Sequence, residues 1–314
     1  MSVSKPKIFL TGGNGMVGKN ILDHELAGCY EIYAPSRTDV DMCNYGSILT
    51  SIAEFKPDIL LHCAGRVGGI RANMSAPLDF LVENLDIGRN VVLASAAVGV
   101  PRLINLASSC MYPKDIDGYL SEDMIMTGSL EPTNEGYALA KIVVARLCEY
   151  VSKTNEKLRY KTVVPCNLYG KFDKFDVQNA HLIPAIISKI HSAKQAGLDT
   201  VEIWGDGTAR REFLYAGDLA DALIGMIDRF ENLPDLMNVG VGSDHTITEY
   251  YQAVAQVLEF DGAFSFDLSK PVGMARKLVS VARQTEWGWS PATDLISGIE
   301  KTVAWYGENY KGTN

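Results

Sequence analysis

Short apolar segments alternate with longer amphipathic ones through the first half of this 314-residue chain, and no other feature constrains its fold as strongly. The segments between the apolar ones have helical spacing, and the longest are 78–98 and 134–152. Such alternation is typical of a parallel sheet with helices on both faces. The sequence therefore predicts an α/β fold with a doubly wound parallel sheet of the Rossmann type. The expected strands are 7–11, 31–34, 58–64, 103–108 and 160–166.

The second half is built from shorter and more varied elements. Mixed short elements fit a smaller α/β lobe over the carboxyl edge of the sheet, where ligands bind in open α/β folds. We divide the chain into a dinucleotide-binding domain, 1–168, and a substrate domain, 169–314. In the second domain we expect a helix at 183–196, strands at 201–204, 212–215 and 237–240, a helix that opens at Asp218, and helices after Thr248 and Pro291.

The net charge and the cysteines restrict the partners and the location. A net charge of -9 argues against nucleic acid or an anionic membrane as a partner, because both bind mainly through Lys and Arg. The N-terminal MSVSKPKIFLTGG has only a short apolar run, so neither a signal peptide nor a membrane span is expected. Because no CxxC pair occurs, we expect no metal site and reduced thiols in the cytoplasm. The cysteines are Cys29, Cys43, Cys63, Cys110, Cys148 and Cys166.

A glycine-rich segment, TGGNGMVG, follows the first strand and opens a helix. Its GxxGxxG spacing permits a tight turn and a close approach of the backbone to a pyrophosphate at the helix N-terminus. Glycine turns are common, so the position in the first strand–helix unit gives the motif its weight. The residues expected against a dinucleotide are Gly12, Gly13, Asn14, Gly15, Met16, Val17 and Gly18.

The end of the second strand distinguishes NAD from NADP, because a carboxylate there accepts the ribose 2′-OH whereas a cation tolerates a 2′-phosphate. The segment YAPSRTD has no acid at the strand end, and Ser36 and Arg37 lie just beyond it. We predict NADP (NADPH), with Asp41 and Met42 at the border of the adenine. The alternative is that Arg37 is a solvated surface residue and that Asp39 or Asp41 contacts the adenosine.

Three further residues indicate carbonyl chemistry. Tyr137 and Lys141 are four residues apart in a helical segment, so their side chains share one face and the ammonium is expected to lower the pKa of the phenol. Ser108 follows the fourth strand. A lone YxxxK occurs by chance, but together with the glycine motif these groups would hold a substrate carbonyl oxygen by two hydrogen bonds beside a nicotinamide.

Longer segments carry a resemblance to a known family. They include AGRVGGIRANMSAPLDFLVENL, LASSCMYPKD, LEPTNEGYALAKI, NLYG, NAHLIPAII, WGDGTARREFLY and SKPVGMARKL. The chain resembles the extended short-chain dehydrogenase/reductases, and within them the GDP-L-fucose synthase family, over nearly its whole length. The resemblance implies NADPH-dependent 3,5-epimerisation and 4-keto reduction of GDP-4-keto-6-deoxy-D-mannose to GDP-L-fucose.

The resemblance also assigns roles to residues. It implies that Cys110 and His181 are the base and acid of epimerisation, whereas without it Cys110 reads as a buried apolar residue and His181 as a core or helix N-terminal histidine. Ser108 and Tyr137 would stabilise the enolate and then the alkoxide. Lys141 would bind the nicotinamide ribose.

The resemblance implies further contacts and a homodimer. The homodimer would form through the helices at 78–98 and 134–152, whose alternative role is only to cover the sheet. Further cofactor contacts are Leu106, Ala107, Ser109, Pro165, Cys166, Asn167 and Leu168. Substrate contacts are Lys189, which reads equally well as a solvated helix residue, Trp204, Arg211, and Lys277, which would reach the diphosphate.

Two positions depart from the family pattern. Asn14 stands where a basic residue is frequent, which removes one contact to a 2′-phosphate, and Val272 stands where the family has a substrate-site acid. Val272 leaves open a related GDP-4-keto sugar, of the 3,6-dideoxy (colitose) or heptose type. A nucleotide-sugar 4-epimerase or dehydratase, and a non-catalytic dinucleotide-binding module, are the remaining alternatives.

Overall fold

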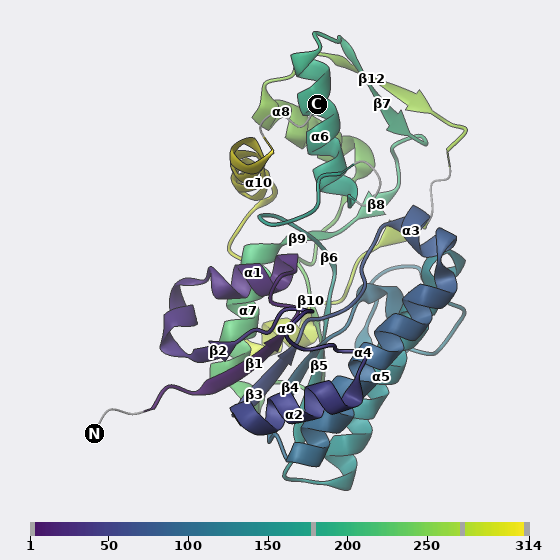
Figure 1. Cartoon of the computed structure of the whole chain (residues 1–314). Coiled ribbons are helices and arrows are strands. Elements are labelled where there is room, and N and C mark those ends of the chain that lie inside the picture. Colours follow the sequence, from purple (N-terminus) through teal and green to yellow (C-terminus); the bar gives the residue numbers. More distant parts are fainter. Residues whose placement is uncertain (1–3, 177–179, 271–273, 311–314) are drawn as a thin grey trace.

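The computed structural model describes residues 4–176, 180–270 and 274–310, and it contains the predicted parallel sheet. Six parallel strands lie in the order β10-β5-β4-β3-β1-β2 (Figure 1). The strand order reverses at β1 and β3, which places the ligand crevice at their carboxyl ends. The doubly wound α/β fold is therefore confirmed. The strands are β1 (Lys7–Thr11), β2 (Glu31–Tyr33), β3 (Ile59–His62), β4 (Arg102–Leu106), β5 (Arg159–Pro165) and β10 (Leu236–Val239).

Helices cover both faces of this sheet, because its central strands are apolar on both sides. On one face Phe9, Leu60 and Leu103 pack against three helices: α2 (Tyr45–Phe55), α4 (Pro77–Val98) and α5 (Glu135–Thr154). On the other face Ile8 and Leu61 pack in one cluster with residues of α1 (Met16–Leu22), α7 (Ala216–Asp228) and α9 (Ala282–Trp287). In the described part of the chain, no helix has an apolar stretch long enough to cross a bilayer.

The second lobe has its own apolar core and is joined to the sheet by short strand pairs (Figure 1). Its helices are α6 (Leu182–Gln195), α8 (Ile247–Leu258) and α10 (Leu295–Asn309), and a short α3 (Ile70–Ser75) precedes α4 in the first lobe. The remaining strands are β6 (Asn167–Tyr169), β7 (Thr200–Trp204), β8 (Arg210–Arg211), β9 (Phe213–Tyr215), β11 (His245–Thr246), β12 (Ala263–Asp267) and β13 (Arg276–Lys277).

The chain crosses between the lobes more than once. After residue 168 it enters the second lobe, but α7 and β10 return to the first sheet, where Met237 pairs with Val163. The boundary at 168 thus stays a prediction about where the substrate lobe begins, and residues beyond it also complete the dinucleotide lobe. The helix expected to open at Asp218 begins at Ala216, which places Asp218 in its first turn, and the Asp218 carboxylate accepts hydrogen bonds from the N–H and hydroxyl of Thr293.

Candidate active site

The glycine loop between β1 and α1 is shaped by close backbone contacts. Gly12 has φ +76°, and a Cβ on it would lie 2.8 Å from the amide nitrogen of Ala64. A Cβ on Gly18 would lie 2.3 Å from the carbonyl oxygen of Gly12, so helix α1 can approach the loop only with glycine there. The Gly15 N–H closes the turn on the Gly12 carbonyl oxygen at 2.9 Å. This cradle of bare backbone fits the pyrophosphate of a dinucleotide.

The loop after β2 carries one exposed cation, Arg37, and two acids that accept hydrogen bonds within the loop, Asp39 and Asp41. The Arg37 side chain is 78 % exposed, and its guanidinium pairs with Glu83 of α4 at 2.8 Å. Asp39 accepts hydrogen bonds from the backbone N–H and the hydroxyl of Ser36, which lower the pKa of its carboxyl. Asp41 likewise accepts the N–H of Cys43 at 2.9 Å. Both carboxylates thus accept hydrogen bonds within the loop itself, and neither needs a ribose hydroxyl as its partner.

Cys110 lies in a short 3₁₀ turn, Ser109–Met111, that follows β4. The Ser108 hydroxyl caps this turn by accepting the Cys110 N–H at 3.4 Å, and it is also hydrogen-bonded to the side chains of Cys110 and Tyr137. Cys110 is 5 % exposed, and burial raises the pKa of its thiol. The structure therefore brings Ser108, Cys110 and Tyr137 together, as expected.

Tyr137 and Lys141 lie one turn apart on α5, but they are related differently from the expectation. The Lys141 ammonium is 5.8 Å from the Tyr137 ring and donates to the Leu106 carbonyl oxygen at 2.9 Å. Burial raises the pKa of the Tyr137 phenol, the Cys110 thiol adds to the rise, and the hydrogen bond to Ser108 opposes it. The lowered phenol pKa expected from Lys141 is thus wrong for this structure: the ammonium is held by the β4 carbonyl.

His181 is the N-cap residue of α6 and is partly buried. Burial lowers the pKa of the imidazole, and the Lys174 ammonium lowers it further. The adjacent Ala180 lies against Gly69, which puts the start of α6 beside the loop after β3. No hydrogen bond joins His181 to Cys110. The assignment of these two residues as the acid and base of epimerisation therefore stays a prediction.

Two buried groups below the site were missed from the sequence. His62, at the end of β3, hydrogen-bonds through Nδ1 to the Thr11 hydroxyl at 2.8 Å, and burial lowers the pKa of its imidazole to about 3. Asn84 of α4 accepts the Arg66 N–H at 2.9 Å and donates to the Arg66 carbonyl oxygen at 3.1 Å. Asn84 holds the backbone that follows β3 directly, whereas His62 bonds the Thr11 hydroxyl, which in turn accepts the Ala64 N–H at 3.1 Å. The polar residue at the end of an apolar strand was the available signal for His62.

The substrate lobe supplies cations and one aromatic side chain. Trp204 is 45 % exposed and lies 4.5 Å from the Arg71 guanidinium of α3, so it faces the first lobe. Arg211 is half-buried, and burial lowers the pKa of its guanidinium while Glu131 opposes this. The Lys189 ammonium donates to the Glu202 carbonyl oxygen, so this lysine is not simply solvated. Val272 lies outside the described residues.

The remaining predicted cofactor contacts lie at the carboxyl ends of β4 and β5. Leu106, Ala107, Ser109 and Cys166 are buried, and Met42 lies in the cluster beneath the α2 face. Asn167 donates from its amide to the Glu212 carbonyl oxygen at 2.8 Å, and Leu168 follows it in β6. With Pro165 at the end of β5, these residues share the edge of the sheet that carries the glycine loop.

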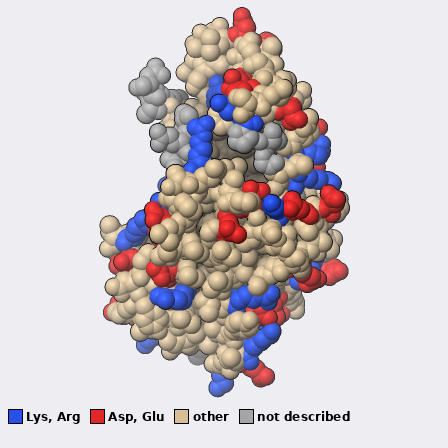
Figure 2. Space-filling view, turned by 90° about the vertical axis from the view of Figure 1, so that its right-hand side faces the viewer, with Lys and Arg blue, Asp and Glu red and all other residues tan. Residues whose placement is uncertain are grey.

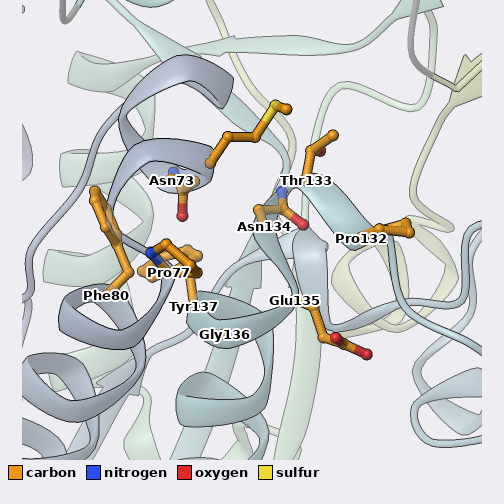
Figure 3. Close-up of a pocket in the computed structure, with 10 residues that line it drawn as sticks. Asn73, Pro77, Phe80, Pro132, Thr133, Asn134, Glu135, Gly136 and Tyr137 are labelled. Carbon is orange, nitrogen blue, oxygen red and sulfur yellow. The ribbon is translucent and has the colours of Figure 1, made fainter.

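A cavity of about 250 Å³ adjoins Tyr137 (Figure 3). It lies between α3 with the start of α4 on one side and the start of α5 on the other, and the Asn73 side-chain oxygen points into it. The side-chain oxygens of Asn73 and Asn134 are buried without a hydrogen-bond partner. Neither asparagine was identified from the sequence. Where the two lobes meet, the surface is hollowed, with Lys and Arg side chains beside the hollow (Figure 2).

A family model described as the NAD dependent epimerase/dehydratase family matches residues 8–240. The chain belongs to this family. It is 53% identical over 300 residues to GDP-L-colitose synthase of Yersinia pseudotuberculosis, covering 96% of this chain and 97% of that protein. It is 47% identical over 300 residues to GDP-L-fucose synthase of Azorhizobium caulinodans, covering 96% of each.

Solved structures of family members share the fold. MlghC, a GDP-mannoheptose C4 reductase from Campylobacter jejuni with NADP bound, has a TM-score of 0.87 at 26% identity and covers 98% of this chain and 99% of that one. A GDP-6-OMe-4-keto-L-xylo-heptose reductase from C. jejuni has a TM-score of 0.89 at 26% identity and covers 97% of this chain and 98% of that one.

These comparisons bear out the resemblance inferred from the motifs and the assignment of the chain as an oxidoreductase that requires a nicotinamide dinucleotide. They test no individual site residue, so the roles of Ser108, Cys110, Tyr137, Lys141 and His181 are taken further as proposals. Among the described residues, no three His, Cys, Asp or Glu side chains are grouped to hold a metal ion.

Proposed function

We propose that this protein catalyses NADPH-dependent 3,5-epimerisation and 4-keto reduction of GDP-4-keto-6-deoxy-D-mannose to GDP-L-fucose. The observation that carries the proposal is the meeting of Ser108, Cys110 and Tyr137 at the carboxyl edge of the sheet. A reductase alone needs the hydroxyls but not the thiol. A thiol hydrogen-bonded to the same serine as the tyrosine is placed to remove a proton from a carbon next to the carbonyl.

In the epimerisation, the Cys110 thiolate accepts the proton from C3 or C5, and the electron pair of that C–H bond moves to O4 as an enolate. Ser108 and Tyr137 donate hydrogen bonds to O4, so one oxyanion site serves both carbons. His181 returns a proton from the other face. NADPH, when bound, supplies a hydride to C4. Tyr137 then protonates the O4 alkoxide.

The phosphate preference is argued from the loop after β2. Arg37 is exposed and close to the end of the strand, and the carboxylate of Asp39 is engaged by Ser36. The NADP bound to MlghC supports the same preference. We therefore assign the 2′-phosphate of NADPH to Arg37 and Ser36, with the pyrophosphate on the Gly12–Gly18 loop.

A second substrate is favoured by one comparison. The GDP-L-colitose synthase of Y. pseudotuberculosis is 53% identical to this chain, and a GDP-4-keto-3,6-dideoxy sugar would use the same oxyanion site. It differs at C3, which has no hydroxyl and hence no stereocentre to invert. Lys189, Trp204 and Arg211 would bind the nucleotide diphosphate in either case.

We also propose that the chain forms a homodimer through α4 and α5 and works in the cytoplasm. Apolar side chains are exposed along both helices, between charged side chains that pair within each helix, and the side shown in Figure 2 is a mixture of apolar and charged surface. Pairing two such faces would bury these side chains in a four-helix contact. Cysteines spread along the chain without CxxC pairs favour a reducing compartment. The exposed residues are Leu78, Val82, Leu93, Leu139, Val143 and Tyr150.

The test is to incubate the protein with NADPH and each of the two keto sugars in D₂O. We expect oxidation of NADPH and deuterium at C3 and C5 of the product from GDP-4-keto-6-deoxy-D-mannose. A larger kcat/KM for the 3,6-dideoxy sugar would transfer the assignment to the colitose-type reaction. Oxidation of NADPH without deuterium at C3 or C5 of the product would show that the protein is a 4-ketoreductase without epimerase activity.

A further inference from the structure

Four basic side chains meet in one short strand pairing of the second lobe. β8 and β13 are parallel, with Arg210 opposite Arg276 and Arg211 opposite Lys277. Side chains alternate between the two faces along a strand, so each of these two pairs shares one face and the two pairs lie on opposite faces. Like charges that face each other across strands destabilise the pairing. Each face therefore needs an anion.

On the first face the anion is Asp244, whose side chain is 3 % exposed. Its Oδ1 accepts the Nε–H of Arg210 at 2.7 Å, and its Oδ2 accepts the Nε–H of Arg276. The Arg210 guanidinium also donates to the Asp244 backbone carbonyl oxygen at 2.7 Å, and it lies 3.8 Å from Glu249 of α8. Burial alone would raise the pKa of the Asp244 carboxyl, but the hydrogen bonds from the two arginines outweigh burial and lower it.

The second face has two cations and no paired carboxylate. Among the described residues, Arg211 and Lys277 form no ion pair, and Arg211 donates one N–H to the Arg210 carbonyl oxygen of its own strand at 2.7 Å. The Glu131 carboxylate favours the charged forms of both cations without pairing with either. Burial lowers the pKa of both cations, so each gains from an anion that binds beside it. A diphosphate supplies two anionic groups to such a pair.

A second buried acid fixes the path of the strands that carry these cations. Glu212 directly follows β8 and is 1 % exposed, and its Oε2 accepts the Val279 N–H at 2.9 Å. Its Oε1 accepts the N–H groups of Val241 at 2.7 Å and Gly242 at 2.8 Å. Glu212 thus ties β8 to the backbone beyond β13 and to the loop after β10. The three N–H groups compensate its buried charge.

Asp244 acts on the same strands in a different way. Glu212 binds only neutral N–H groups, whereas Asp244 binds two charged side chains. Without the Asp244 charge, Arg210 and Arg276 would face each other with no anion between them. Their repulsion would act across the two strands that carry the second pair of cations. The spacing of the cations on one face therefore depends on the carboxylate on the other face.

We propose that Asp244 is a positioning residue for the diphosphate of the substrate. It pairs with Arg210 and Arg276 on one face of β8 and β13. This pairing holds Arg211 and Lys277 at a fixed spacing on the other face, where they bind the two phosphates. The inference rests on the proposed GDP-sugar substrate, and it assigns a role to a side chain that does not itself contact the ligand.

The test is binding of GDP to the full-length protein, measured by isothermal titration calorimetry, with GMP as the reference ligand. GMP lacks the second phosphate, so the ratio of the two affinities reports on the diphosphate. Asp244→Asn keeps the shape of the side chain and removes its charge. We expect GDP affinity to fall about tenfold and GMP affinity to fall less. NADPH binding, measured by cofactor fluorescence, should not change, because the glycine loop belongs to the other lobe.

A second substitution tests whether charge is the cause. Arg276→Met alone removes one bond to Asp244 and should weaken GDP binding about threefold, the value of a half-exposed ion pair. Combined with Asp244→Asn, it removes one of two repelling cations and should restore part of the lost affinity. Losses that add in the double variant would overturn the charge mechanism. Unchanged GDP affinity in Arg276→Met would overturn the proposal even if Asp244→Asn does not fold.

Asp218→Asn is the matched control, because Asp218 is another buried carboxylate that accepts two hydrogen bonds, both from Thr293. It should leave the ratio of GDP to GMP affinity unchanged. An unchanged ratio in Asp244→Asn, or an equal fall in Asp218→Asn, would overturn the role of Asp244. GDP binding uses no keto sugar, so these results are distinct from a failure of the reaction in D₂O. A wild-type protein that binds no GDP would overturn the GDP-sugar substrate and this inference with it.

Discussion

Cys110 takes part in only one half of the proposed reaction: it is needed for epimerisation at C3 and C5 but not for binding of the cofactor that reduces C4. Cys110→Ser should abolish deuterium exchange at C3 and C5 while NADPH binding is kept, because a hydroxyl is a far weaker base than a thiolate and the cofactor loop is untouched. Exchange is measured by NMR of the recovered nucleotide sugar, and binding by NADPH fluorescence. Undiminished exchange would remove the thiol from the mechanism.

The pH dependence of exchange follows from opposite shifts of the proposed acid and base. Burial raises the pKa of the Cys110 thiol and lowers the pKa of the His181 imidazole. The reactive form of the enzyme has a Cys110 thiolate together with a His181 imidazolium. At any pH between the two pKa values this form is a small fraction of the enzyme, and that fraction does not change with pH. Exchange should rise with pH through the His181 value, stay flat across neutral pH, and fall above the Cys110 value. A maximum confined to a narrow range near neutral pH would contradict these shifts.

Arg37 is the residue on which the cofactor preference depends. Arg37→Ala should weaken NADPH binding by about ten- to a hundredfold, the value of one charge-assisted contact, and should leave NADH binding nearly unchanged. Arg89→Ala removes another exposed arginine, which pairs with Asp86, and serves as control. Equal losses for both cofactors would mean that the 2′-phosphate is bound elsewhere.

At the scale of elements, α4 and α5 pack so closely that one position requires glycine. A Cβ on Gly88 would lie 2.2 Å from a methyl carbon of Val144. Gly88→Ala should therefore lower the free energy of unfolding by about 1–3 kcal/mol through overpacking, measured by urea denaturation. Gly88→Ala combined with Val144→Ala should recover part of the loss, whereas additive losses would show that the contact is not the cause.

The elements were predictable from sequence where their pattern is local. The strand and helix of the glycine loop, and the helix with Tyr137 and Lys141, follow from periodicity and spacing alone. The cavity with Asn73 and Asn134 depends on segments far apart in the chain. Glu212 was read as part of a strand, but its role comes from three N–H groups that only the tertiary fold assembles.

At the scale of the whole molecule, the proposed dimer makes a prediction about the face of α4 and α5. Leu139 is 41% and Val143 is 42% exposed, so the double change Leu139→Asp and Val143→Asp would place charges in the centre of the contact. We expect a monomer by size-exclusion chromatography with light scattering. Leu268→Asp, at a 74% exposed site in the substrate lobe, should leave the dimer intact. A monomeric wild-type protein would contradict the homodimer itself.

The return of β10 to the first sheet limits how this chain can be divided. A fragment ending at residue 168 would leave β5 with an unpaired edge and the face beneath α7 uncovered, which together invite aggregation. The substrate lobe is for the same reason not a cassette that recombination can exchange as one piece. New sugar specificities within this architecture must arise by substitutions in place, while the interleaved path of the backbone is preserved.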